Sequence, residues 1–93
     1  MRAILKNTEI TIQNIDREPE RPVFESIIQA FQTDKRIDIK DKISGPSEDI
    51  VIAECNKEEV SLMYDINFGL MPIKCTEENV NLIFDVVNEI LTK

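Results

Sequence analysis

The sequence predicts an α+β protein, a two-layer sandwich in which a mostly antiparallel sheet of four to five strands carries two helices on one face. Three observations favour this class. Short segments alternate apolar and polar residues as strands do, two longer segments repeat apolar residues as helices do, and each helix has a single apolar stripe. A helix with one stripe needs one surface to cover it, so both fit on one side of a sheet. The predicted order is β(β)-α-β-β-β-α, in one domain over residues 1–93.

The chain opens with extended structure over residues 2–15, where isoleucines alternate with polar neighbours. The sequence leaves two forms open for this segment: a small hairpin that turns at Asn7-Thr8, or one long strand. The charged segment 16–22 follows, and its two prolines exclude a continuing strand in the sheet interior.

Residues 22–33 predict a helix, and residues 35–43 predict a strand at the edge of the sheet. Pro22 suits the first helical turn, where its missing N–H is not needed. The apolar residues of the helix follow the spacing of one helical face, and they include Phe24, Ile27, Ile28 and Phe31. In the strand, the three isoleucines, Ile43 included, share one face, and charged residues share the other, which suits an exposed edge.

The stretch 48–68 predicts a β-hairpin in the middle of the sheet. Its second half alternates, which places these residues on the buried side: Val60, Leu62, Tyr64, Ile66 and Phe68. We expect a four-residue loop at 56–59, which pairs Glu54 with Ser61. A two-residue loop would instead place Glu54 opposite Glu59, and like charges directly opposite one another are unfavourable.

The apolar connection 69–75 predicts either a short edge strand near Ile73 or a loop against the core, and the alternative is an exposed loop used for binding. Residues 77–92 predict the second helix. Thr76 is its expected N-cap, acidic residues occupy its first turn, and Lys93 lies at its C-terminal end, where the helix dipole favours positive charge.

The net charge of −7 belongs entirely to the second half of the chain. Residues 1–46 hold eight acidic and eight basic residues, whereas residues 47–93 hold ten acidic and three basic ones. This field repels phosphate groups, so we expect no nucleic-acid partner, and it favours encounter with a basic protein. The chain start lacks the pattern of a signal peptide and no apolar run reaches membrane-spanning length, so we expect a cytoplasmic protein without membrane contact.

Little in the sequence suggests catalysis. The chain has no histidine, its two glycines cannot form a phosphate-binding loop, and Cys55 and Cys75 are expected to be reduced thiols. Adjacent carboxylates do not converge in a strand, because neighbours there point to opposite faces. We therefore expect no enzyme activity, no metal site and no cofactor.

The sheet face away from the helices is the predicted binding surface. Ile52 and Met63 are expected to form its apolar centre, with carboxylates around them. The candidate partner-binding residues are Asp49, Ile52, Glu54, Glu58, Glu59, Met63 and Asp65. The alternative is that neighbouring residues cover Ile52 and Met63, in which case the acids only maintain solubility.

These features predict a small acidic protein-binding module. Small acidic α+β proteins without catalytic residues are often immunity proteins or inhibitors that neutralise a basic toxin by presenting carboxylates to it, which is an analogy of class and not of motif. The carboxylates would steer and hold the partner, and Ile52 and Met63 would anchor it. The alternative function is a self-associating structural or accessory subunit, a homodimer formed through the same face or through the 69–75 segment.

Overall fold

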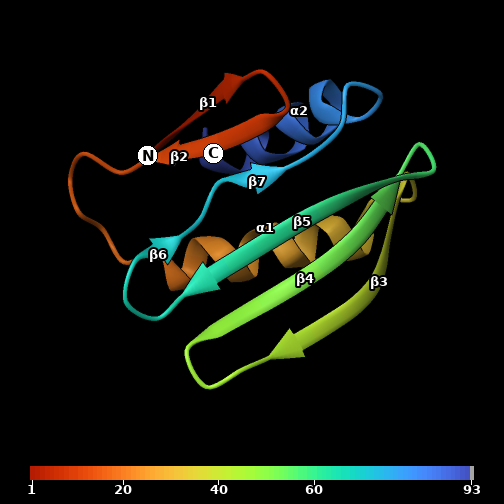
Figure 1. The fold of residues 1–93 in the computed structure, drawn as a ribbon. Coiled ribbons are helices and arrows are strands. Elements are labelled where there is room, and N and C mark those ends of the chain that lie inside the picture. The colour runs from red at the N-terminus through yellow and green to blue at the C-terminus, as the bar shows by residue number, and fades with distance from the viewer. Residues whose placement is uncertain (93) are drawn as a thin grey trace.

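A computed structural model describes residues 1–92 and has an α+β fold, an antiparallel sheet of seven strands with two helices. Figure 1 shows both helices on the same side of the sheet, and we call the opposite side the open face. The elements are β1 (Arg2–Lys6), β2 (Glu9–Gln13), α1 (Arg21–Thr33), β3 (Ile37–Ser44), β4 (Glu48–Cys55), β5 (Glu58–Asp65), β6 (Gly69–Leu70), β7 (Ile73–Lys74) and α2 (Val80–Leu91). Neither helix in the described part of the chain has the length and apolar character needed to cross a membrane.

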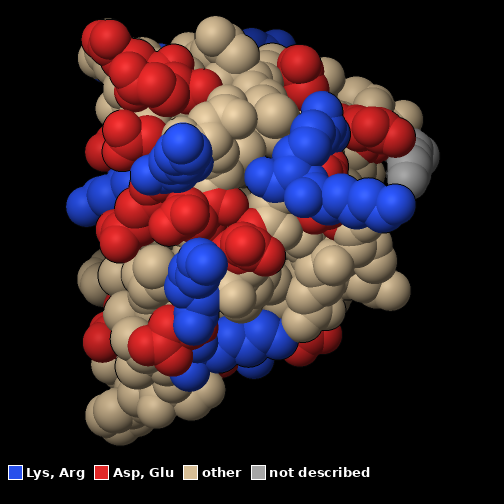
Figure 2. All heavy atoms as spheres, turned by 90° about the vertical axis from the view of Figure 1, so that its right-hand side faces the viewer, with Lys and Arg blue, Asp and Glu red and all other residues tan. Residues whose placement is uncertain are grey.

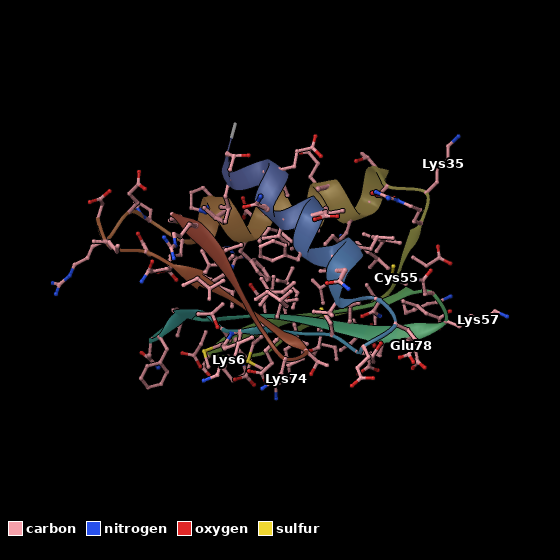
Figure 3. The ribbon with its side chains drawn as sticks, turned by 90° about the horizontal axis from the view of Figure 1, so that it is seen from above. Lys6, Lys35, Cys55, Lys57, Lys74 and Glu78 are labelled. Carbon is pink, nitrogen blue, oxygen red and sulfur yellow. The ribbon has the colours of Figure 1, made fainter. Side chains whose placement is uncertain are left out.

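The sheet has seven strands instead of the predicted four to five, in the order β1-β2-β7-β5-β4-β3, with β6 paired to the end of β5. The extra strands arise because residues 2–15 form the β1–β2 hairpin and the 69–75 segment supplies both β6 and β7. β7 lies between β2 and β5, not at an edge, and its Ile73 is fully buried. The predicted sandwich is matched only in part, since β1 and β2 are turned relative to β3–β5 and pack against α2 (Figure 3).

The core lies between the sheet and the two helices. The predicted apolar face of α1 is confirmed, because Phe24, Ile27 and Phe31 are all buried. They belong to one cluster with the inward-facing residues of β4 and β5, which are Val51, Ala53, Cys55, Val60 and Leu62. The edge position predicted for β3 is also confirmed by the strand order.

The β4–β5 hairpin turns in two residues, Asn56 and Lys57, so the predicted four-residue loop is wrong. Both have positive φ, 56° and 65°, as in the type I′ turns whose twist matches that of a two-residue hairpin. Glu54 therefore lies opposite Glu59. Turn geometry outweighs this like-charge opposition, which costs about 0.2–1 kcal/mol. The buried face is unchanged, because a shift of two residues preserves the alternation of a strand.

A β-bulge in β3 moves Ile43 onto the open face. β3 pairs with β4 as far as Ile39 and resumes at Asp41, which leaves Lys40 as the extra residue. The alternation is reversed beyond this point, so Ile43 lies opposite Ile50 and 47% of its surface is exposed. The prediction that Ile43 shares the face of the earlier isoleucines is therefore wrong.

The strand β5 ends at Asp65, and the last two apolar residues of the predicted alternation, Ile66 and Phe68, are exposed. The Oδ1 atom of Asp65 accepts hydrogen bonds from the N–H of Asn67 at 2.8 Å and of Phe68 at 3.1 Å, which turns the chain out of the sheet. Gly69 then adopts a φ of 82°, a conformation that glycine tolerates best. Ile66 is 68% exposed and Phe68 is 79% exposed, so their predicted burial is wrong.

The helix α2 begins at Val80, later than predicted, and its N-cap position is Asn79 instead of Thr76. The reason is tertiary. Asn79 is only 1% exposed, and its side chain bonds to the backbone of both β4 and β5, whereas the Oγ1 of Thr76 is buried without a partner among residues 1–92. The predicted placement of Lys93 lies outside the described residues.

Candidate protein-binding site

Three rows of side chains cross β3, β4 and β5 on the open face. The acidic row is Asp38, Glu54 and Glu59, the middle row is Asp41, Ile52 and Ser61, and the apolar row is Ile43, Ile50 and Met63. Neighbours within a row are directly opposite one another, which places their Cα atoms about 5 Å apart, and successive rows are about 7 Å apart. A line of carboxylates therefore runs parallel to a line of apolar side chains.

Solvent reaches all three rows. The three residues of the acidic row are exposed, and the isoleucines and methionine at the centre of the face are half-buried, while Ile43 at its edge is exposed. Figure 1 shows no described element lying over β4 and β5 on this side. Ile52 and Met63 are consequently not sealed inside the fold, and the open face presents apolar area beside its charges.

The acidic row breaks a general rule of sheet stability. Asp38 lies opposite Glu54, and Glu54 lies opposite Glu59, so two like-charge pairs are adjacent at a cost of about 0.2–1 kcal/mol each. The Nζ of Lys40 offsets part of this cost, at 3.6 Å from a carboxylate oxygen of Asp38. Within residues 1–92, neither glutamate has an ion-pair partner. Local conflicts of this kind are characteristic of functional sites.

The structure places most of the predicted binding residues on the open face, and these are Ile52, Glu54, Glu59, Met63 and Asp65. Asp49 and Glu58 have the opposite parity and lie on the helix side, because successive residues of a strand alternate between faces. Asp65 is at the far end of β5, about 20 Å along the strand from Glu59, and its carboxylate holds the turn that follows. The single patch that the sequence predicted is therefore corrected to the three rows.

Asp49 takes part in an ion pair on the helix side of the sheet. Its Oδ2 lies 2.5 Å from Nη1 of Arg21, and this hydrogen bond, aided by one from Ser44, holds the pKa of Asp49 below its usual range. The Arg21 guanidinium also lies 5.2 Å from the centre of the Tyr64 ring. Because Arg21 and Asp49 satisfy each other, this pair has a structural role on the helix side of the sheet.

The carboxylates of the open face and the two thiols on the core side of the sheet show no arrangement suited to metal binding or nucleophilic chemistry among the described residues. Among the described residues, no three carboxylates or thiols are placed to hold a metal ion, so the acidic row consists of separate charges. Burial raises the pKa of the Cys55 thiol and raises that of Cys75 to about 12. Both thiols are thus protonated at neutral pH, a form that is weakly nucleophilic.

The end of the molecule that carries the β4–β5 turn has charges of both signs. Figure 2 shows a band of acidic side chains there with basic side chains above, below and among them. Lys57 and Glu78 lie at this end (Figure 3), and the side chain of Asn56 donates a hydrogen bond of 2.9 Å to the carbonyl of Glu78. The acidic row lies at this same end, because Glu54 and Glu59 flank the turn, and its three acids are consecutive across the strands.

Sequence reasoning missed two residues of this surface, Asp38 and Ile43. Only the register of β3 on β4 brings Asp38 beside Glu54, and this register is not visible in the sequence of β3 alone. Ile43 reaches the open face because of the bulge at Lys40, and nothing in the local sequence marks a bulge there. A pairing hypothesis for β3 and β4 is the signal that could have found Asp38.

Comparison with known protein families, with characterised proteins and with solved structures found no match to this chain. The geometry and charge of the open face are therefore the features that bear on function.

Proposed function

We propose that this chain is a small acidic cytoplasmic protein-binding module whose open face receives a basic protein, most concretely an immunity- or inhibitor-type protein that neutralises a basic toxin. The carboxylates of the acidic row steer and hold the partner, and the exposed parts of the middle and apolar rows supply its anchor. The two free thiols, Cys55 and Cys75, support a reducing compartment.

One observation carries this proposal: Asp38, Glu54 and Glu59 are held directly opposite one another beside apolar residues that solvent reaches. In the free protein this row opposes folding, and a basic partner would relieve the repulsion when it binds. An apolar centre next to a charged rim is also the usual composition of a protein interface. Inhibition of a toxin is the specific form of this function that agrees with the small size and the net charge of −7.

The test compares two variants that remove equal charge from opposite sides of the molecule. Glu54→Gln/Glu59→Gln removes two of the three charges of the acidic row, and Asp85→Asn/Glu89→Gln removes two exposed charges from α2. A basic protein captured from the producing cells is identified, purified and titrated against each by calorimetry at low and high salt. We expect the first variant to bind about tenfold or more weakly and the second within about twofold of the unaltered chain, because local pairs contribute more than net charge.

The Glu54→Gln/Glu59→Gln variant should also fold at least as stably as the unaltered chain, because removing like charges relieves their repulsion. Weak binding by that variant therefore cannot be ascribed to unfolding. Equal loss of affinity in both variants would mean that the partner responds to overall charge, and unchanged affinity in the first would exclude the open face. Either outcome rejects the proposal.

Self-association is the second candidate function, and the exposed side chains of Ile66 and Phe68 favour it. Both project from a turn fixed by hydrogen bonds to Asp65, so little conformational entropy is lost when a second copy covers them. A structural or accessory subunit of this kind should sediment as a dimer at micromolar concentration, insensitive to salt, and Phe68→Ala should shift it to monomer. A monomer in the unaltered chain rejects this second function.

A further inference from the structure

We propose that the basic partner docks an amphipathic helix on the open face, lying across β3, β4 and β5 along the direction of the rows. This inference rests on the proposed function and names the element that the partner contributes. The lysine or arginine side of this helix faces the acidic row, and the apolar side of the helix faces Ile43, Ile50 and Met63.

The spacing along the rows matches a helix better than a strand. The carboxylates of Asp38, Glu54 and Glu59 follow one another at intervals of about 5 Å, so the row spans about 10 Å. In a helix, side chains at positions i, i+4 and i+7 share one face and rise by about 6 and about 10.5 Å along the axis. In an extended strand, three residues on one face span about 13 Å, which is longer than the row.

The spacing between the rows matches the width of a helix. Glu54 and Ile50 are four residues apart in one strand, which separates the acidic row from the apolar row by about 13 Å. A helix with its side chains is about 10–12 Å wide. Its underside then rests on the middle row, where Ser61 is small, Ile52 offers apolar contact and Asp41 adds a carboxylate at the edge strand. The helix can therefore touch both outer rows at once.

Charge limits the helix to these three strands. Beyond β5, Lys74 is opposite Ser61, and the register continues to Glu9 and then to Lys6. Figure 3 shows Lys6 and Lys74 on the open side of the sheet, where they continue the middle row and place positive charge, partly offset by Glu9, beneath a longer basic helix. On the opposite side, β3 is the last strand of the sheet. The footprint is thus about two helical turns, a short recognition element.

The probe for this proposal is a synthetic peptide of about four helical turns, stapled on its solvent side, with lysines at i, i+4 and i+7 and leucines on the adjacent stripe. A permuted peptide of equal composition and staple mixes lysine and leucine around the helix, and a third peptide places the same residues in an extended alternating sequence. Binding is measured by fluorescence anisotropy, and amide chemical shifts locate each peptide on the protein.

We expect the segregated helix to bind at least about tenfold more tightly than either comparison peptide and to shift amides of β3, β4 and β5. Glu54→Gln/Glu59→Gln should weaken it about tenfold, whereas Asp85→Asn/Glu89→Gln should leave it within about twofold. Equal binding of the permuted peptide, tighter binding of the extended one, or no binding at all rejects the helix. If the captured protein still depends on the acidic row in such a case, the proposed function stands and only the helical partner is wrong.

Discussion

Replacing Asn79 with alanine is expected to lower the free energy of unfolding by about 3 kcal/mol. The Nδ2 of Asn79 donates to the carbonyl of Cys55 at 3.0 Å and to that of Glu58 at 3.1 Å, and its Oδ1 accepts from the N–H of Thr76 at 2.9 Å. Alanine removes these three hydrogen bonds, each worth about 0.5–1.5 kcal/mol, and leaves the N–H of Thr76 without its side-chain partner, and a buried unpaired group costs about 1–3 kcal/mol. Water can reach the partly buried bonds, which keeps the expected total below the upper end of their sum.

Urea unfolding followed by circular dichroism measures this loss, with linear extrapolation to water. Asn81→Ala is the matched control, because Asn81 is an exposed asparagine in the first turn of the same helix. It should change the free energy of unfolding by no more than about 0.5 kcal/mol, as surface substitutions usually do. A loss below about 1 kcal/mol for Asn79→Ala would show that these hydrogen bonds do not fix the hairpin to the start of α2.

The role of Asn79 illustrates what sequence reasoning cannot reach. Thr76 followed by two glutamates satisfies every local rule for the start of a helix, and those rules see only neighbours in the chain. The bonds of Asn79 join residues more than 20 positions apart, 24 to Cys55 and 21 to Glu58. Tertiary contacts of this kind decided where α2 begins, and they also hold the tight turn at Asn56 that the sequence had placed in a longer loop.

The periodic features were predictable because they repeat. The face of α1 that carries Phe24, Ile27 and Phe31 follows from their spacing alone. The buried face of β4 and β5 was predicted correctly despite the wrong turn, since the error in register was two residues and the strand repeat is also two. Irregular features, such as the bulge at Lys40 and the strand β7 inserted beside β2, have no repeat that could reveal them.

The candidate site also has one part that follows from periodicity in the sequence and one part that does not. Ile52, Glu54 and Met63 were placed on the correct face because alternation within one hairpin determines it, whereas Glu59 had been predicted to lie in the loop. Their arrangement into rows depends on the register between strands, which is set by the turn and by the bulge. The row of three acids, which carries the functional proposal, therefore could not be predicted from composition or from periodicity in a single strand.

Phe31→Ala is expected to cost about 4 kcal/mol, while Phe68→Ala is expected to change stability by no more than about 0.5 kcal/mol. Both residues belong to apolar patterns that predicted burial. Phe31 is fully buried in the core, where its loss leaves a cavity, whereas 79% of Phe68 is exposed. Since small domains are stable by about 5–15 kcal/mol, the first substitution should remove a large share of the stability and the second almost none.

The two substitutions are identical in chemistry, so their difference reports burial directly. Urea unfolding of both variants measures their free energies of unfolding. The dependence of that free energy on urea concentration should be the same for both. A loss above about 1.5 kcal/mol for Phe68→Ala would place its ring in the core, as the alternation of Val60 to Phe68 predicted, and would contradict the turn at Asp65. The expected result instead leaves a folded protein that lacks its most exposed apolar side chain. That variant separates the two candidate functions, because binding of a basic partner to the acidic row should survive in it and self-association through Phe68 should not.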